Sequence, residues 1–309
     1  MITMAKLCEG MMLLVEILFL ALKVFYFFCE NIFRIFIPIT KKSVADEIVL
    51  ITGAGHGIGK ELAIGYASLG ATVICWDINE ETNKQTMNDI KMMGRNAVYA
   101  YQCNVADRKE VFRVAEKVKK EVGDVTILVN NAGIAFAKAL LNQNIDEVSR
   151  VIDVNIKSHY WTLQAFLPSM IEKNHGHIVA LSSIVAFLGA THGTVYCPTK
   201  SAVKVLMEAV SDELRIYSKG KSLIQFTTIY PTLILTGLVK KPRIRFPFIM
   251  KGLTPHDAVL LIIDAQRKNV RQRSIPSYWL PIMYLIRLLP NKAISSIIDF
   301  LDVGVDEED

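Results

Sequence analysis

The sequence predicts an α/β fold: a single doubly wound parallel sheet with helices on both faces, preceded by an apolar, membrane-associating helix. Between residues 43 and 274, short apolar runs alternate with amphipathic stretches, as in parallel strands joined by crossover helices. Most of these runs lack polar alternation, which is typical of strands covered on both faces. The surplus of apolar residues is concentrated before residue 40 and after residue 274.

The first 42 residues are predicted to be a hydrophobic segment that associates with a membrane. The stretch from Met11 to Ile37 is mostly Leu, Ile, Phe, Val and Met, and has about the length of a membrane span. Because charges deep in hydrocarbon are costly, a helix that lies in the interface or bends is favoured over a simple span. A buried core helix or an oligomer helix is the alternative. The charged residues recur every seventh position and would form one helical stripe: Glu9, Glu16, Lys23 and Glu30.

The flanks of this segment indicate that the rest of the chain faces the cytosol. A cleaved signal peptide is a poor fit, since the sequence has neither a strongly basic start nor a small-residue cleavage site. Arg34, Lys41 and Lys42 follow the apolar stretch and suit the cytosolic surface of an anionic membrane. The five cysteines are scattered without a Cys-x-x-Cys pair, so we expect reduced thiols.

The body of the chain, residues 43–274, is predicted to be one domain, because no repeat or low-complexity linker divides it. Its helical stretches begin near Gly57, Glu80, Lys109, Ile145 and Val195. The candidate strands that alternate with them cover residues 48–52, 72–76, 97–101, 127–130, 177–181 and 224–230.

Charge and histidine spacing argue against two classes of partner. The formal charge of +5 is modest and the chain has no long Lys/Arg run, so we expect no nucleic-acid binding. No metal site is predicted, because the histidines form neither a His-Glu-x-x-His motif nor a similar ligand grouping. His175 and His177 flank Gly176, which is more typical of a turn before a strand.

A glycine-rich turn joins the first predicted strand to the first helix of the body. The stretch from Thr52 to Gly59 reads Thr-Gly-Ala-Gly-His-Gly-Ile-Gly, in the strand–turn–helix context that such a motif requires. Glycines let the backbone approach a pyrophosphate, while the helix amino terminus supplies N–H donors and a positive dipole end. We therefore predict a dinucleotide site here, formed by Gly53, Gly55, His56, Gly57, Ile58 and Gly59.

The end of the second strand indicates which dinucleotide is bound. Asp77 lies 24 positions after Gly53, where a carboxylate can accept hydrogen bonds from the adenosine ribose and would repel a 2′-phosphate. The glycine turn contains no Arg or Lys, and none follows Asp77 directly. These observations predict NAD rather than NADP. A second role for Asp77, as the cap of the following helix, is compatible.

Further motifs follow in a fixed order and spacing. Asn130-Asn131-Ala132-Gly133 comes after the fourth strand, then Asn155, Ser183, and Tyr196-Cys197-Pro198-Thr199-Lys200. With the glycine turn, this set resembles the short-chain dehydrogenase/reductase superfamily over roughly residues 46 to 240. The resemblance implies a Rossmann-type fold and a nicotinamide-dependent alcohol dehydrogenase or carbonyl reductase.

Three positions depart from the family's common pattern. Asn104 stands where the family usually has an Asp that touches the adenine, and an amide can still form that hydrogen bond; Val105 is expected beside it. Pro198 replaces a small residue, which a helix tolerates in its first turn. Thr232 replaces the usual Gly after Pro231, and could alter the shape of that loop.

The catalytic residues are expected to be Asn155, Ser183, Tyr196 and Lys200. Loss of a hydride from a carbinol must be accompanied by loss of the hydroxyl proton, so a base is needed. Tyrosine is a poor base unless a cation favours its phenolate, and Lys200 lies one helical turn after Tyr196. Taken alone, a Tyr-x-x-x-Lys pair is usually a surface pair; the surrounding motifs give it meaning.

The resemblance adds roles for these and other residues. It implies that Ser183 hydrogen-bonds the reacting oxygen, that Asn155 supports a proton-relaying water, and that Lys200 also holds the nicotinamide ribose. In the reverse reaction Tyr196 is the acid. The resemblance further implies cofactor contacts from Tyr196 and Lys200 and from two loops: Asn131, Ala132 and Gly133 in one, and Pro231, Ile234 and Thr236 in the other.

The segment around residues 237–255 lies where the family places its substrate lid. Residues 240–251 interleave basic and apolar side chains without an acid, which suits docking on anionic lipid or, equally, a solvated loop. Residues 275–309 are predicted to be apolar helices broken by prolines, which cover the pocket or touch a membrane. They end in an acidic stretch, 302–309, that we expect to be mobile.

The apolar amino terminus, this core and the Pro-punctuated end resemble one branch of the superfamily. It contains the 17β-hydroxysteroid dehydrogenases of types 11 and 13, the epidermal retinol dehydrogenases and retinol dehydrogenase 10. The resemblance implies a homodimer on endoplasmic-reticulum or lipid-droplet membranes, facing the cytosol and oxidising a lipophilic alcohol with NAD. It does not select among steroids, retinoids and long-chain alcohols. A carbonyl-lipid reductase and a lipid-droplet scaffold with little activity are the alternatives.

Overall fold

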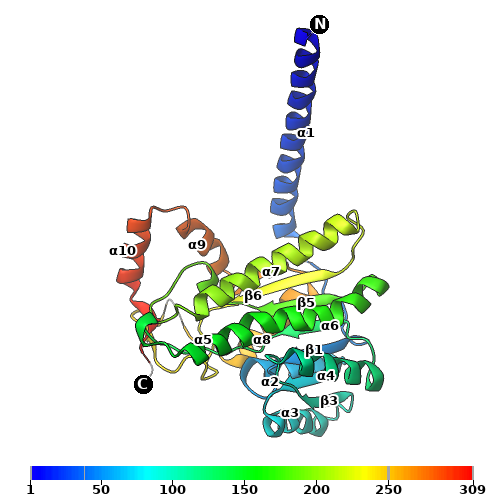
Figure 1. Cartoon of the computed structure of the whole chain (residues 1–309), viewed down its shortest axis with the longest axis vertical. Helices are drawn as coiled ribbons and strands as arrows, with labels where there is room; N and C mark the ends of the chain where they lie inside the picture. The colour runs from blue at the N-terminus through cyan, green and yellow to red at the C-terminus, as the bar shows by residue number, and fades with distance from the viewer. Residues whose placement is uncertain (1, 38, 249–250, 308–309) are drawn as a thin grey trace. The chain divides into compact units, whose positions relative to one another are not determined.

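The computed structural model describes residues 2–37, 39–248 and 251–307. Contacts within the chain divide it into two compact units, Met1–Lys41 and Lys42–Asp309. The first unit is built on one long helix, α1 (Ile2–Phe36), and the second contains a twisted sheet with helices on both faces (Figure 1).

Helix α1 has 35 residues, and its apolar side chains, such as Leu14, Phe19 and Phe25, are exposed. Lys6–Glu30 is long and apolar enough to cross a membrane, with a mean hydropathy of 2.3. The predicted helical conformation is confirmed, so Glu9, Glu16 and Lys23 recur at seven-residue intervals along one side of the helix.

The sheet is parallel throughout and has seven strands in the order β3-β2-β1-β4-β5-β6-β8. All six predicted strands are confirmed, three of them with the predicted bounds and the others shifted or extended by one residue. The order reverses between β1 and β4, where ligands bind outside the carboxyl ends of strands in such sheets. The strands are β1 (Ile48–Thr52), β2 (Thr72–Asp77), β3 (Val98–Gln102), β4 (Ile127–Asn130), β5 (His177–Leu181), β6 (Gln225–Pro231) and β8 (Gln272–Ile275).

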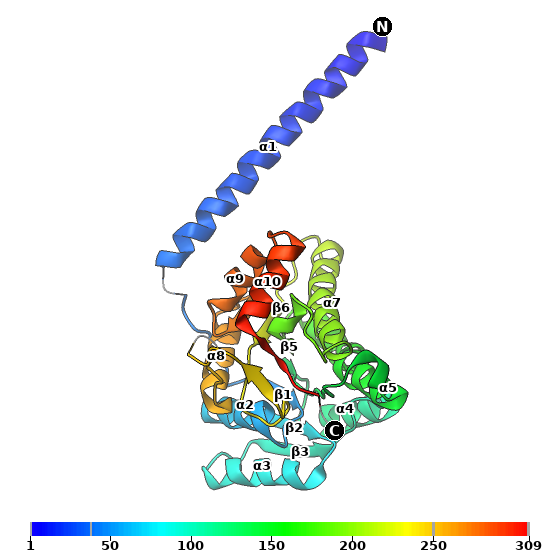
Figure 2. The ribbon, with the colours of Figure 1, turned by 90° about the vertical axis from the view of Figure 1, so that its left-hand side faces the viewer.

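Two apolar clusters cover the two faces of the sheet. Alternate residues of β1 belong to different clusters, Val49 and Ile51 to one and Leu50 to the other, because successive side chains point to opposite faces. Figures 1 and 2 show the covering helices. One face carries α2 (Gly57–Ser68), α3 (Glu80–Met92) and α8 (Pro255–Arg267); the other carries α4 (Arg108–Glu121), α6 (Ser158–Lys173) and α7 (Tyr196–Tyr217).

The helix starts follow local capping. Asn79 caps α3 by accepting hydrogen bonds from the N–H groups of Glu81 and Thr82, and Asp107 caps α4 in the same way. The starts of α2, α3 and α5 (Ile145–Ile152) agree with prediction, whereas α4 and α7 begin one residue from the predicted positions.

The C-terminal region belongs to the same compact unit as the sheet. As expected, prolines break it into two helices, α9 (Trp279–Ile286) and α10 (Asn291–Leu301). Trp279 and Met283 of α9 pack with Phe187 and Tyr230, next to the short helix η3 (Ile184–Ala186) that follows β5. Helix α9 therefore covers the segment that leads out of β5.

Residues 302–307 of the acidic end, which we expected to be mobile, form ordered contacts with the lid. Residues Val303–Val305 form strand β9, which pairs antiparallel with β7 (Pro242–Ile244) of the lid (Figure 2). The acids resemble a solvated tail in the sequence, but Arg243 supplies a counter-charge to Asp302 and to Asp306. Positions 308 and 309 lie outside the described residues.

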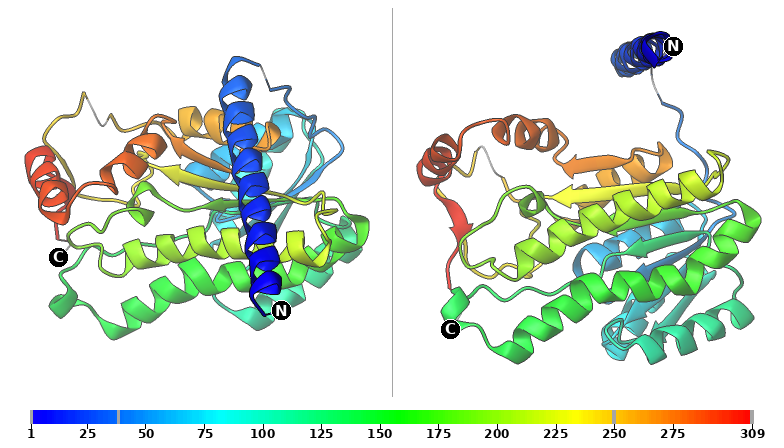
Figure 3. Two further views of the ribbon diagram at one scale, coloured as in Figure 1. Left: turned by 90° about the horizontal axis from the view of Figure 1, so that it is seen from above. Right: turned by 45° about the horizontal axis from the view of Figure 1, so that its top comes forward.

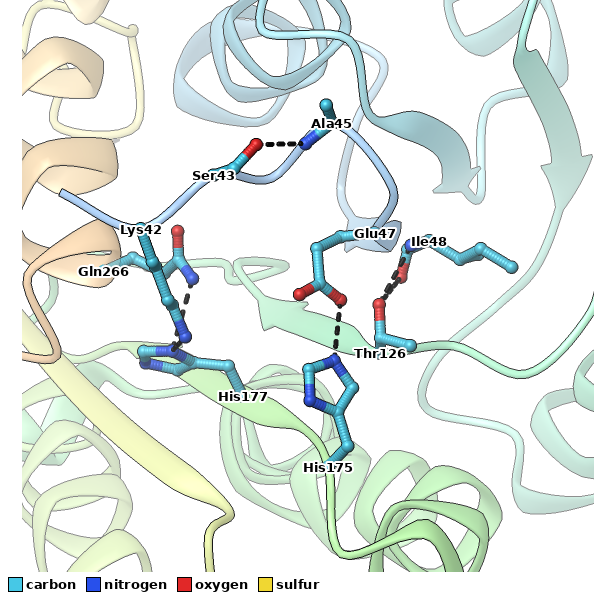
Figure 4. A network of polar contacts seen from close by, with 9 residues as sticks. All are labelled: Lys42, Ser43, Ala45, Glu47, Ile48, Thr126, His175, His177 and Gln266. Carbon is cyan, nitrogen blue, oxygen red and sulfur yellow. Dashed lines mark hydrogen bonds and ion pairs between the residues drawn. The ribbon is translucent and has the colours of Figure 1, made fainter.

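At the amino-terminal edge of the sheet, the start of the unit is fastened to α8 and β5 (Figure 4). The Lys42 N–H donates to the Arg267 carbonyl (2.9 Å), and the Arg267 Nε–H donates to the Lys42 carbonyl (2.8 Å). Lys42 Nζ lies 3.0 Å from Nδ1 of His177, whose Nε2 lies 2.8 Å from the Thr227 hydroxyl. His175 pairs with Glu47, so both histidines have contacts that belong to the fold. They follow a turn at the end of α6 and lead into β5, as predicted.

Candidate active site

The glycine-rich turn connects β1 to α2 and is shaped by close backbone packing. Gly53 and Gly57 have φ angles of +67° and +57°, which favour glycine. A Cβ atom on Gly59 would collide with the Gly53 carbonyl, and one on Gly55 would lie 2.9 Å from the Asp77 carboxylate. His56, which precedes α2, makes no capping hydrogen bond through its side chain within the described part of the chain. The helix start is thus suited to a phosphate, and a dinucleotide fits this cradle.

Asp77 lies at the carboxyl end of β2, buried against the glycine turn. One carboxylate oxygen accepts the Gly55 N–H (2.8 Å) and the other accepts the Asn79 N–H (2.9 Å). Its suggested role as the cap of α3 is wrong, because Asn79 holds that position. The N–H of Cys103 donates to the Asp77 carbonyl, so Asn104 and the buried Val105 follow at the neighbouring strand end.

The loop after β4 is joined to the glycine turn through Asn131. Its side-chain amide donates to the carbonyls of Thr52 (2.8 Å) and Gly53 (3.2 Å). The backbone N–H groups of Asn131 and Ala132 both donate to the Thr52 hydroxyl. Sequence reasoning missed this role of Thr52; its place at the strand end, directly before Gly53, was the available signal.

Asn155 is fully buried between the loop after β4 and α7. It lies in a π-helical turn, η2 (Asp153–Lys157), which follows α5. Its side chain exchanges two hydrogen bonds with the backbone of Ile134 (2.9 and 2.8 Å) and donates to the Thr199 hydroxyl (3.2 Å). Such single turns bulge a side chain out of helical register and often occur at functional sites. A Cβ on Gly133 would lie 3.5 Å from Asn155 Oδ1 and 3.4 Å from Lys200 Nζ, so these groups converge.

Ser183, Tyr196 and Lys200 meet at the carboxyl ends of β5 and β6. Tyr196 begins α7, which places Pro198 in the first turn as expected. Lys200 Nζ lies 5.6 Å from the centre of the Tyr196 ring and donates to the Leu181 carbonyl (2.9 Å). The Ser183 hydroxyl lies 3.4 Å from the Pro231 carbonyl.

The electrostatics of this group are set by burial. Burial raises the pKa of Tyr196 above its ordinary value, while a hydrogen bond with Ser183 lowers it. Burial lowers the pKa of Lys200 to about 8, so this side chain remains largely protonated at neutral pH. A cation next to a buried phenol favours the phenolate, which is the effect that proton transfer by Tyr196 would require.

The loop after β6 returns to the glycine turn. A Cβ on Gly57 would lie 3.1 Å from the Thr236 methyl group, so these two predicted cofactor contacts are neighbours. Ile234 forms a parallel bridge with Leu253, which ties the two ends of the lid together. The Thr232 hydroxyl donates to the Ile275 carbonyl (3.0 Å), which accounts for a threonine where the family has glycine.

The predicted cofactor and catalytic residues therefore converge on one edge of the sheet. Next to them, an apolar hollow of about 390 Å³ opens beside the first turn of α7, between the segment after η3 and α9. Among its lining residues are Val185, Phe187, Leu188 and Cys197, with Arg287 as the charged member. The described residues contain no group of three or more His, Cys, Asp or Glu side chains that could hold a metal ion.

Comparison with known proteins agrees with this geometry. The family model described as short chain dehydrogenase matches residues 47–244. The chain is 37% identical to 17-beta-hydroxysteroid dehydrogenase 13 of Homo sapiens over 283 residues, covering 92% of each protein. It is 40% identical to epidermal retinol dehydrogenase 2 of Mus musculus over 263 residues, covering 85% of this chain and 84% of the relative.

A solved structure supports the fold independently. The short chain dehydrogenase/reductase from Burkholderia phymatum in complex with NAD superposes with a TM-score of 0.71 at 22% identity, over 80% of this chain and 94% of that one. The chain belongs to the short-chain dehydrogenase/reductase family, in the branch of the 17β-hydroxysteroid and epidermal retinol dehydrogenases, and is an NAD(P)-dependent oxidoreductase.

Proposed function

We propose that the protein is a membrane-associated, NAD-dependent dehydrogenase that oxidises a hydroxyl group of a lipophilic substrate to the carbonyl. The observation that carries the proposal is the convergence of Ser183, Tyr196 and Lys200 at the sheet edge that also holds the glycine turn. A steroid, a retinoid or a long-chain alcohol is the substrate class.

The proposed chemistry assigns one role to each side chain. The Tyr196 oxygen takes the proton of the substrate hydroxyl, and the Ser183 hydroxyl hydrogen-bonds the same oxygen. Lys200, held by the Leu181 carbonyl, supplies the positive charge that favours the Tyr196 phenolate. Asn155, whose side-chain amide is held by the Ile134 backbone, supports a water that relays the proton to Lys200. Bound NAD would accept the hydride from the carbinol carbon.

The preference for NAD over NADP rests on Asp77. Its carboxylate is directed at the glycine turn by the Gly55 N–H, where the adenosine ribose would lie. A carboxylate there accepts hydrogen bonds from ribose hydroxyls, whereas a 2′-phosphate would face like charge. Asn104 and Val105, at the end of the neighbouring strand, are proposed to line the adenine.

The membrane location and substrate class rest on apolar surface and on the relatives. Helix α1 provides an apolar segment long enough to cross a bilayer or to lie in its surface. Phe248, Leu141 and Phe300 are exposed near the lid and α10 and suit lipophilic ligands. The two relatives are named for steroid and retinol substrates. We propose the endoplasmic reticulum or lipid droplets as the location, a cytosolic catalytic unit, and a homodimer.

An alcohol screen on membranes tests the proposal. Membranes containing the full-length protein would be supplied with retinol, a steroid diol or a long-chain primary alcohol, and NADH formation would be followed by its absorbance. Membranes with Ser183→Ala provide the background. We expect turnover above background with at least one alcohol, and faster turnover with NAD than with NADP. Turnover with none of them, or with NADP alone, contradicts the proposal.

A further inference from the structure

Three loops leave the carboxyl edge of the sheet around the candidate site. One follows β4 and contains Ala139 and Asn142, one lies between η3 and α7 and contains His192, and the third is the lid after β6. Substrate must pass this edge to reach Tyr196. Residues 302–307, which we call the C-terminal strap, contact all three loops.

The strap is most extensively joined to the lid. Strands β9 and β7 pair in the register Pro242↔Val305, Arg243↔Gly304 and Ile244↔Val303. The Arg243 guanidinium forms ion pairs with Asp302 (2.8 Å) and Asp306 (2.6 Å), and the Asp306 N–H donates to the Lys241 carbonyl. The lid cannot swing away from the sheet edge as a unit without breaking these contacts.

The same strap holds the other two loops. The Val305 carbonyl accepts a hydrogen bond from Nδ1 of His192 (2.7 Å), four positions before Tyr196. The Glu307 carboxylate accepts hydrogen bonds from the Ala139 N–H (3.2 Å) and the Asn142 side-chain amide (2.9 Å). Figure 3 shows β9 descending from α10 to this place, beside the segment that precedes α5.

Several exposed side chains of these loops are apolar. Leu141, next to Asn142, is 96% exposed, and Phe248 is 82% exposed. The Phe246 ring contacts Phe248 edge-to-face and Phe300 in a tilted arrangement, and Arg245 lies over the Phe246 ring. Side chains of this kind contact a lipophilic ligand, whereas the ion pairs of Arg243 fix the backbone that carries them.

We propose that the C-terminal strap is a specificity-determining element: it joins the three loops into one rim and so sets the affinity for the lipophilic substrate. The proposal rests on the proposed dehydrogenase function. Release of the strap loosens the three loops and therefore raises the KM for a long-chain alcohol. It leaves the glycine turn and Asp77 unchanged, so the affinity for NAD stays the same. The strap pairs are half exposed, so the expected rise is about three- to tenfold.

The test uses the full-length protein in membranes with two sets of strap variants: Asp302→Asn with Asp306→Asn, and Glu307→Ala, which removes the oxygen that accepts both hydrogen bonds. Asp212→Asn is the matched control, because it removes an exposed ion pair with Arg215 on α7, away from the strap. KM for a long-chain primary alcohol and the dissociation constant of NAD are measured for each. Hydrogen exchange of residues 240–248 reports whether the lid is released.

The expected result is a higher alcohol KM in both sets of strap variants and faster exchange of residues 240–248 in the variant of Asp302 and Asp306, with unchanged NAD affinity and a silent control. Unchanged exchange or unchanged KM overturns the proposal, as does an equal loss of NAD affinity. Restoration of slow exchange by Arg243→Glu combined with Asp302→Lys and Asp306→Lys, but not by Arg243→Glu alone, supports it. If the unmodified protein oxidises no alcohol, the dehydrogenase function fails, and exchange alone decides whether the strap holds the lid.

Discussion

Replacing Asp77 with asparagine is expected to reverse or abolish the preference for NAD. The two carboxylate oxygens accept the N–H groups of Gly55 and Asn79, at 2.8 and 2.9 Å. Asparagine has one acceptor oxygen, so it cannot serve both backbone groups and also bind a ribose hydroxyl. A lost charge-assisted hydrogen bond costs about 1.5–3 kcal/mol, which is roughly ten- to a hundredfold in NAD affinity.

The same substitution removes the negative charge that opposes a 2′-phosphate, so NADP should lose less than NAD or gain. The measurement is the ratio of kcat/KM for NAD to that for NADP, with a saturating alcohol. Asp107→Asn is the matched control, because Asp107 also follows a strand and accepts backbone N–H groups but lies outside the glycine turn. A ratio in Asp77→Asn within twofold of the unmodified protein would refute the reasoning.

Three further predictions concern stability and the glycine turn. Burial lowers the pKa of Lys200 to about 8; the unfolded chain therefore binds more protons, and stability rises with pH from about 8 to 10.5. Lys200→Met should be inactive yet up to about 3 kcal/mol more stable at pH 7 by urea unfolding, and a less stable variant would contradict this. Burial also lowers the pKa of His177, so the unfolded chain takes up a proton first and the free energy of unfolding should fall as the pH drops below about 6.5. In His177→Gln, the slope of the free energy of unfolding against pH between about 7.5 and 5.5 should be smaller by about one proton. An unchanged slope would argue against this role of His177. Gly59→Ala should lose NAD binding, measured by calorimetry, or fail to fold, because its Cβ would meet the Gly53 carbonyl. Gly189→Ala, whose Cβ would meet no described atom within 4 Å, should bind NAD as the unmodified protein does. Intact NAD binding in Gly59→Ala would contradict the assignment of the glycine turn as the dinucleotide site.

The features that the sequence predicted well are those set by local pattern. Strands β1, β4 and β5 have their predicted bounds because they are continuous apolar runs between turns. The helix after the glycine turn and the position of Tyr196 at the start of α7 follow from residue order alone. Strand β8 was missed because Gln272-Arg273-Ser274-Ile275 is polar, and its place at the edge of the sheet tolerates that.

The features that the sequence did not predict depend on contacts between distant residues. The acidic end pairs with Arg243, 59 positions before Asp302, so its order cannot be inferred from its own composition. The π-helical turn at Asn155 is fixed by two hydrogen bonds to Ile134 across a separate loop. The convergence of the predicted site residues needed the whole sheet, although the family motifs named each of them.

The most direct test of the proposed chemistry is the turnover of Tyr196→Phe. This variant keeps the aromatic ring that Lys200 Nζ faces but removes the hydroxyl oxygen that would take the proton. NADH formation from the best alcohol is measured beside NAD affinity, with Tyr217→Phe, at the exposed end of α7, as the matched control. We predict a loss of kcat of about 10²- to 10⁴-fold in Tyr196→Phe, with NAD affinity retained and Tyr217→Phe unaffected. Turnover of Tyr196→Phe at the rate of the unmodified protein would contradict the assignment.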